Sequence, residues 1–262
     1  MSKRKNVVYY PIIVPIVRNR FNLFQTLCSA LKKNEVEIQD GDIIVFSSKF
    51  VSLSEGRVLD LDKIQPSKKA LEIASKLNMS SSLTEIVIRE ADTIFSGIVG
   101  FLLTIKEGVV VPNAGIDKSN IDDGKVILYP QDPFVSANRI RMQILFELEK
   151  KVGVIISDSR LMPTRIGTIG ITLAVSGFQP VSDERGKKDL FGNIICVTKR
   201  AISDEISAGA NFLMGETDER TPIVIVRDTD LKMVDQKFGK NHLSIDEDEC
   251  IFVRGLNLKP IN

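Results

Sequence analysis

The fold is decided by the stretch Val152-Gly-Val-Ile-Ile-Ser-Asp-Ser-Arg160, in which an apolar run ends abruptly in small polar and charged residues. An uninterrupted, largely β-branched apolar run is typical of a strand that is covered on both faces. Similar runs recur along the chain and predict further strands at Ile43–Phe46, Val109–Val111, Val126–Leu128 and Ile223–Val226. The sequence therefore predicts a buried β-sheet.

Apolar residues at helical spacing lie between these runs. They predict amphipathic helices over Phe24–Leu31, Ala70–Leu77, Pro133–Leu148 and Ile202–Leu213. Asp132 is the expected N-cap of the third helix, with Pro133 in its first turn. Helices and strands together predict a mixed α/β (α+β) fold. Five glycines punctuate residues 157–192, so we expect this segment to be rich in loops.

Composition excludes several classes of protein. Thirty-five basic and 34 acidic residues give a formal charge of +1, which argues against nucleic acid as a partner. The three cysteines lie far apart without any Cys-x-x-Cys, so a reducing cytoplasm is expected. Prolines break the apolar run 7–17, which predicts an edge strand rather than a signal peptide, and no run reaches the roughly 18 to 20 residues of a membrane span.

The common nucleotide-binding motifs do not occur in the sequence. It contains neither a Gly-x-x-x-x-Gly-Lys-Ser/Thr loop nor a Gly-x-Gly-x-x-Gly after a strand, so we expect a fold of neither the P-loop nor the Rossmann type. The single histidine, His242, lies in a polar stretch, which argues against a Ser-His-Asp mechanism. No repeat or linker divides the chain, so one domain over residues 1–262 is expected, with two intimate lobes as the alternative.

Three of the apolar runs end in the same way, with an abrupt change to polar residues at 47–49, 112–120 and 157–160. Ligands of open α/β sheets gather beyond the carboxyl ends of strands. Asp158 beside Ser159 suits Mg²⁺ or Mn²⁺, which take hard oxygen ligands, and Asp117 would be a second carboxylate. The alternative for each aspartate is a helix cap or a satisfied turn.

Two cationic side chains are candidates for work on a phosphate. Ser47, Ser48 and Lys49 offer two hydroxyls and an ammonium, although a solvated turn would read the same way. Arg165, near Gly167, could stabilise the charge that develops on a transferring phosphoryl group, and a surface salt bridge is its alternative role. From these residues alone both alternatives stay open, and Lys49 and Arg165 are the candidate catalytic residues if the site acts on a phosphate.

Four motifs resemble the coenzyme F420-0:L-glutamate ligase (F420-0:gamma-glutamyl ligase) family in order and spacing. They are Asn113-Ala-Gly-Ile-Asp-Lys-Ser-Asn120, Gly153-Val-Ile-Ile-Ser-Asp-Ser159, Asp183-Glu-Arg-Gly-Lys-Lys-Asp-Leu-Phe-Gly192, and Asp204-Glu-Ile with Leu213-Met-Gly-Glu216. The first is a long and specific octet. The similarity covers residues 7–228, nearly the whole chain.

The resemblance implies a ligase that uses GTP and a divalent metal, with K⁺ as an additional candidate ion. It would phosphorylate the lactyl carboxylate of F420-0 and let the amine of L-glutamate attack the acyl phosphate. The resemblance also implies a homodimer with interlocked subunits. The implied metal ligands are Asp117, Asp158, Ser159 and Glu216, and the implied GTP-binding residues are Val14, Pro15, Ile16, Val17, Ser48, Lys49, Asn120, Gly215, Glu216 and Thr217.

This chain departs from the family pattern at three places. Leu53 stands where a lysine is usual, the motif at residues 157–163 drops a glycine and moves an arginine to position 160, and Gly170 stands where an aspartate is common. These departures leave two alternatives open. One is a related nucleotide-dependent amide ligase with another acceptor acid or amine, and the other is a non-catalytic nucleotide-binding homologue.

Overall fold

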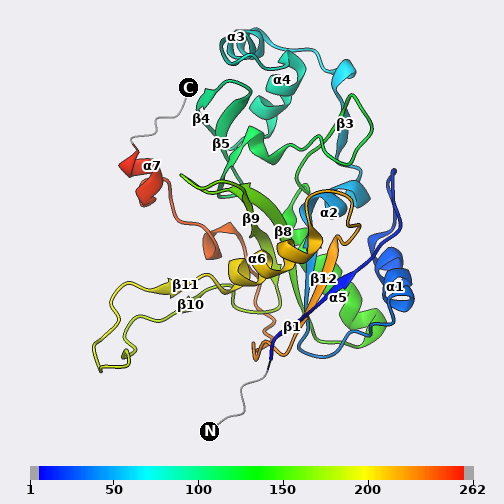
Figure 1. Cartoon of the computed structure of the whole chain (residues 1–262), viewed down its shortest axis with the longest axis vertical. Coiled ribbons are helices and arrows are strands. Elements are labelled where there is room, and N and C mark those ends of the chain that lie inside the picture. Colours follow the sequence, from blue (N-terminus) through cyan, green and yellow to red (C-terminus); the bar gives the residue numbers. More distant parts are fainter. Residues whose placement is uncertain (1–5, 257–262) are drawn as a thin grey trace. The chain divides into compact units, whose positions relative to one another are not determined.

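The computed structural model describes residues 6–256 and divides the chain into two compact units (Figure 1). Within the described residues, unit 1 comprises residues 6–16, 22–51 and 132–243, and unit 2 comprises residues 17–21, 52–131 and 244–256. Both units mix helices with strands, which confirms the predicted mixed α/β class.

Unit 1 is built on a five-stranded sheet. Its strand order is β1 (Val8–Ile12), β12 (Ile223–Arg227), β2 (Ile43–Ser47), β8 (Gly153–Leu161) and β9 (Thr168–Ser176). β2 and β8 pair in parallel, from Ile43 opposite Gly153 to Ser47 opposite Ser157, and the other neighbours are antiparallel. The N-terminal strand β1 lies at the edge of this sheet, as the prolines of the run 7–17 predicted.

The centre of this sheet is buried on both faces, as the apolar runs predicted. Each residue from Ile43 to Phe46 and from Ile223 to Val226 is buried. The helices of unit 1 are α1 (Leu23–Lys33), α5 (Pro133–Leu148) and α6 (Ile202–Met214). The Asp132 side chain accepts a hydrogen bond from the Val135 amide and caps α5, which confirms the predicted cap.

The prediction of a loop-rich segment over residues 157–192 is wrong in its first half. β8 continues to Leu161, and β9 occupies Thr168–Ser176 with its last seven residues buried. The strand was not predicted because glycines are typical of turns, whereas Gly170 allows close packing within a strand. Further on, β10 (Ser182–Asp183) pairs with β11 (Lys199–Arg200), and together they carry the projecting arm of unit 1 seen in Figure 1.

Unit 2 contains two small antiparallel sheets. One has three strands, β4 (Thr93–Ile98), β5 (Phe101–Lys106) and β6 (Val109–Pro112), and the other pairs β3 (Val58–Asp60) with β7 (Lys125–Ile127). Its helices are α3 (Lys68–Leu77), α4 (Ser81–Glu90) and α7 (Ile251–Gly255), while α2 (Ser48–Glu55) begins in unit 1 and ends in unit 2. Residues of α4, β5 and β7 supply its main core.

Two predictions about the run Val109–Val111 are wrong. The run forms β6, which belongs to a separate sheet of unit 2, so its end does not join the ends of β2 and β8 at one sheet edge. Only Val111 of the three residues is fully buried. A short β-branched run fits a half-covered hairpin strand as well as a central strand, and its hairpin partner decides between them. None of the helices within residues 6–256 is long and apolar enough to cross a membrane.

Candidate active site

The parallel pair of strands in unit 1 brings Ser48 and Asp158 together. Ser47 and Ser157 form the last residue pair between β2 and β8. The residues that follow them, Ser48 and Asp158, therefore lie at the same end of this parallel pair. The Ser48 hydroxyl donates a hydrogen bond of 2.7 Å to Oδ1 of Asp158. Ser48 is buried as the first residue of α2, so the alternative of a solvated turn is wrong for this side chain. Lys49 follows it in the same helix and is half-buried.

Ser159 joins a different cluster, which we call the Glu216 cluster. Successive side chains of a strand point to opposite faces, so Ser159 faces away from Asp158. The Glu216 carboxylate accepts hydrogen bonds from Ser159 Oγ at 3.3 Å, from Thr168 Oγ1 at 3.1 Å and from Asn211 Nδ2 at 3.3 Å. The predicted metal ligands of unit 1 are therefore divided between two clusters.

The predicted nucleotide segments of unit 1 lie beside each other. The Val14 amide donates a 2.8 Å hydrogen bond to the carbonyl of Arg220, which follows the turn carrying Gly215, Glu216 and Thr217. Glycine suits this turn because the φ of Gly215 is +68°, a backbone conformation that L side chains rarely adopt. In contrast, Pro15 and Ile16 are exposed, and Val17 belongs to unit 2.

Arg165 lies in the exposed connection between β8 and β9. Its amide donates a hydrogen bond to the Met162 carbonyl, and the preceding Thr164 has a positive φ of 60°. The side chain of Arg165 is exposed. The structure therefore leaves its predicted role in phosphoryl transfer as a prediction.

Asp117 and Asn120 lie in unit 2, in the octet 113–120. The Asp117 backbone pairs with Ile127 in both directions, at 3.0 and 2.9 Å. Its carboxylate accepts hydrogen bonds from the amide and the hydroxyl of Ser119, at 2.7 and 3.1 Å. Asp117 therefore forms the satisfied turn that was the alternative to a metal-binding role, and Asn120 in this turn has a left-handed φ of 55°. Asp117 and Asp158 belong to different units.

The oxygen-only character of these donors fits a hard cation. Asp158 and Ser48 in one cluster, Glu216 and Ser159 in another, and Asp117 in unit 2 offer carboxylate and hydroxyl oxygens, without histidine or thiolate. No three His, Cys, Asp or Glu side chains gather as a metal-binding group anywhere in residues 6–256. Mg²⁺ usually takes one or two carboxylates and completes its shell with water and phosphate oxygens, so the residues fit such an ion.

Of the polar residues that link β9 to α6, Asp204 was named from the sequence as part of a family motif, but Thr172 and Ser207 were not singled out. The Thr172 amide donates to Asp204 at 2.9 Å, and the Thr172 and Ser207 hydroxyls lie 2.9 Å apart. Two periodic patterns in the sequence could have indicated these contacts between β9 and α6. Thr168, Gly170 and Thr172 alternate along one face of β9, while Ser207 and Asn211 are four residues apart on α6.

Asp204→Asn should change how stability depends on pH. Burial raises the pKa of Asp204, against the opposing effects of the Thr172 amide and Arg160. The folded protein therefore holds this proton at pH values where the unfolded chain has released it, and stability falls as the pH rises from the usual carboxyl pKa through the raised one. Denaturant unfolding across this range should show a smaller fall for Asp204→Asn. Exposed Asp248→Asn is the control and should leave the pH dependence of stability unchanged. If Asp204→Asn also leaves it unchanged, burial does not raise the pKa of Asp204 in the folded protein.

Gly170→Ala should destabilise the protein by about 1–3 kcal/mol, as expected for overpacking. An added Cβ would lie 2.4 Å from the Ser207 carbonyl oxygen and 2.5 Å from Asn211 Cβ, so α6 would have to move away from β9. Urea unfolding measures the loss. Gly255→Ala is the matched control because an added Cβ there meets nothing within 4 Å. Equal stability of the two variants would refute the packing role of Gly170.

Comparison with known proteins now decides the family. The family model described as F420-0:Gamma-glutamyl ligase matches residues 11–228, which is most of the chain and includes Asp117, Asp158 and the Glu216 cluster. The chain belongs to the F420-0:gamma-glutamyl ligase family. The predicted resemblance is confirmed, and so is the prediction of an enzyme of the ligase class.

Several curated relatives of this ligase family carry the name Coenzyme F420:L-glutamate ligase. The protein from Methanocaldococcus jannaschii is 45% identical over 191 residues, covering 72% of this chain and 76% of its own. That from Methanothermobacter thermautotrophicus is 36% identical over 82% of this chain and 85% of its own. That from Methanosarcina barkeri is 32% identical over 91% of both chains.

Proposed function

We propose that this protein ligates L-glutamate to coenzyme F420-0 through an amide bond to its lactyl carboxylate, with a γ-linkage for any further glutamate. The observation that carries the proposal is the family match over residues 11–228, supported by relatives whose names state this activity. The octet 113–120 and Asp158, the residues on which the resemblance was first based, both lie inside the matched region.

We propose that GTP activates the acid. The γ-phosphoryl group passes from GTP to the lactyl carboxylate of F420-0, giving GDP and an acyl phosphate. The amine of glutamate then attacks the acyl carbon, the amide C–N bond forms, phosphate leaves, and the amine loses a proton. Phosphate is a far better leaving group than the oxygen of a carboxylate, which is why the activation is needed.

Several residues of the chain have proposed roles in this reaction. Lys49 and Arg165 offset negative charge on the phosphoryl group, and the hydrogen bond from Ser48 holds the Asp158 carboxylate in place. A bound Mg²⁺ or Mn²⁺ would neutralise phosphate charge, with K⁺ as an additional candidate ion. The proposed ligands of divalent cations are Asp158 beside Ser48, Ser159 with Glu216 in the Glu216 cluster, and Asp117 in unit 2. The proposed nucleotide-binding residues are Val14–Val17, Ser48, Lys49, Asn120 and Gly215–Thr217.

We extend the proposal to a homodimer. The arm between β10 and β11 exposes Leu190 fully, and it also exposes Phe191 and Val197 by 91% and 85%. Apolar side chains gathered on a projecting segment are typical of a surface that another chain covers. A second copy of this protein is the proposed occupant, and size-exclusion chromatography with light scattering would test it.

A related ligase with another acceptor acid or amine is the second candidate. It is favoured by the departures at Leu53 and at residues 160–162, where Leu161 and Met162 are 50% and 36% exposed at the end of β8. Exposed apolar side chains at this place would favour an acceptor with an apolar portion.

One assay separates these candidates. The purified protein is incubated with F420-0, L-glutamate, Mn²⁺ and either GTP or ATP, and the products are analysed by mass spectrometry. The proposal expects a glutamyl adduct of F420-0 that requires the nucleotide, with GTP preferred. If F420-0 is unchanged while a known ligase converts it in the same mixture, the proposed substrate is wrong and other acceptor acids should be screened.

A further inference from the structure

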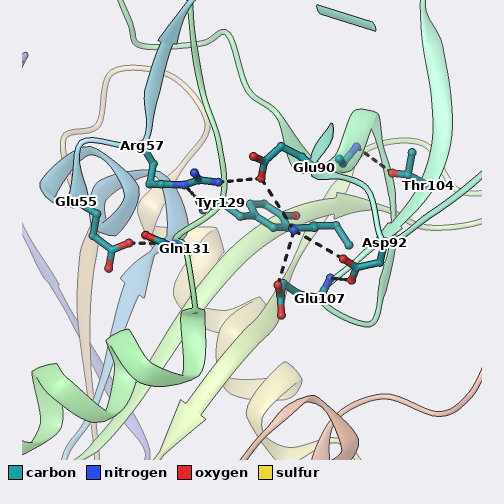
Figure 2. Close-up of polar contacts among 10 residues, drawn as sticks. Glu55, Arg57, Glu90, Asp92, Thr104, Glu107, Tyr129 and Gln131 are labelled. Carbon is teal, nitrogen blue, oxygen red and sulfur yellow. Dashed lines mark hydrogen bonds and ion pairs between the residues drawn. The ribbon is translucent and has the colours of Figure 1, made fainter. Parts of the chain in front are cut away.

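Arg57 links three parts of unit 2. Its Nη2 donates to Oε2 of Glu90 at the end of α4, at 2.8 Å, and its Nε donates to the carbonyl of Tyr129, at 3.1 Å (Figure 2). Its own carbonyl accepts a hydrogen bond from the Leu128 amide, at 3.0 Å. Arg57 therefore holds the segment that follows β7 in two ways, because its backbone carbonyl binds the Leu128 amide and its side chain binds the Tyr129 carbonyl.

The buried Tyr129 ring in turn supports the octet 113–120. An added Cβ on Gly115 would lie 2.1 Å from Cζ of Tyr129, so the ring packs directly against the Gly115 backbone. Gly115 has a positive φ of 70°, as do its neighbours Asn113 and Ala114 at 51° and 54°. The left-handed conformation is costly for the two non-glycine residues, Asn113 and Ala114, and it persists only where the surroundings hold it.

The same turn places Asp117. Two backbone hydrogen bonds join Asp117 to Ile127, the last residue of β7, which lies two residues before Tyr129. Thr104 holds the other side of the turn, because its hydroxyl donates to the Val111 carbonyl and accepts from the Ala114 amide. The position of the Asp117 carboxylate is thus set through the backbone that Tyr129 and Thr104 support.

We propose that Arg57 and Tyr129 are positioning residues that hold Asp117 ready for its cation. The inference rests on the proposed function, because that proposal names Asp117 as a metal ligand. Neither residue contacts the reacting groups in this scheme. Groups that orient a ligand without binding the metal commonly change metal affinity by about 10- to 100-fold when they are removed.

The charges around Arg57 explain why an arginine is needed. The Glu90 oxygen that accepts from Arg57 also lies 4.0 Å from Nζ of Lys106, and Lys106 lies within 4 Å of Asp92 and Glu107 as well. Lys106 thus already supplies a point charge to Glu90. A guanidinium adds what an ammonium lacks, two directed donors in one plane, one for Glu90 and one for the Tyr129 carbonyl.

The test measures Mn²⁺ binding directly. Free Mn²⁺ is followed by electron paramagnetic resonance during titration of the full chain with GDP present, and thermal unfolding is recorded for every variant. We expect Arg57→Met and Tyr129→Leu each to weaken Mn²⁺ binding by about 10-fold or more, and Arg57→Lys to lie between them and the wild type. The ligase reaction should show the same rise in half-saturating Mn²⁺, with kcat recovering as Mn²⁺ is raised.

Arg89→Met is the matched control. Arg89 Nε also donates to a glutamate of α4, Oε1 of Glu85, at 2.8 Å, but this pair makes no hydrogen bond to the segment 113–129 that the structure describes. It should lower stability slightly and leave Mn²⁺ binding unchanged. The double variant Arg57→Met/Tyr129→Leu should have a Kd for Mn²⁺ at most about twofold above the higher Kd of the two single variants. The two losses do not add, because both residues act through one turn.

The outcomes separate the two proposals. If the wild type binds Mn²⁺ and Arg57→Met changes only the thermal midpoint, as Arg89→Met does, the positioning role is overturned while the proposed function stands. If the wild type binds no Mn²⁺ and catalyses without metal, the metal part of the proposed function fails and the positioning role fails with it. If Arg57→Met does not fold, Arg57→Lys and Tyr129→Leu decide, and wild-type affinity in both overturns the inference.

Discussion

Asp158→Asn is expected to lower kcat/KM of the ligase reaction by at least about 100-fold, or about 2.7 kcal/mol of transition-state stabilisation. An amide has nearly the shape of a carboxylate and can still accept the hydrogen bond from Ser48, but it lacks the charge that a divalent cation requires. Mass-spectrometric rates of glutamate addition, measured at several Mn²⁺ concentrations, give the loss and its dependence on metal.

The control for this substitution is Asp248→Asn. Asp248 is an exposed carboxylate that pairs with Arg254 outside the region matched by the family, and it should leave the rate unchanged. If Asp158→Asn keeps both the wild-type rate and the wild-type metal dependence, Asp158 is not a metal ligand. The proposed site in unit 1 would then have to be abandoned.

Asp42→Ala is expected to cost about 3–5 kcal/mol of stability, because it leaves the Arg227 charge without its partner. Asp42 is 1% exposed, and both of its carboxylate oxygens accept hydrogen bonds of 2.8 Å from Arg227. The guanidinium also lies 5.0 Å from the centre of the Tyr10 ring. Thermal unfolding should show a midpoint lower by roughly 6–20 °C, at 2–4 °C per kcal/mol for a unit of this size.

Two further variants test the cause of this loss. Removing both charges with Asp42→Leu/Arg227→Met should recover much of the stability, because no unpaired charge stays buried. Asp248→Ala breaks an exposed ion pair of similar type and should cost less than about 1 kcal/mol. Equal losses for Asp42→Ala and Asp248→Ala would show that burial of the pair contributes nothing.

Much of the fold could be predicted from local pattern. The helices α1, α3, α5 and α6 and the strands β2, β7, β8 and β12 lie where periodicity placed them, because each repeats its burial pattern over several residues. β9 was missed because Gly170 reads as a turn residue when its neighbour α6 is unknown. β6 and β7 were both assigned to the wrong sheet, because short apolar runs do not specify their partner strands.

The candidate site divides in the same way. Asp158 and Ser48 could be expected to meet, since two strands that end in polar residues at one sheet edge bring those residues together. Thr168 and Asn211 were not singled out, because their role depends on which face of β9 meets which face of α6. The division of the chain into two compact units, with Asp117 in one and Asp158 in the other, was weighed only as an alternative.

The sequence alone therefore determined the class of fold, the family and the identity of the candidate residues. These depend on residue type and short spacing, which the order of residues along the chain contains directly. Tertiary structure decided which residues lie together: Ser159 with Glu216 rather than with Asp158, and Arg57 with the Tyr129 carbonyl. The physical reason is that a side chain's partners depend on the faces that strands and helices present to each other, and residues distant in sequence form those faces.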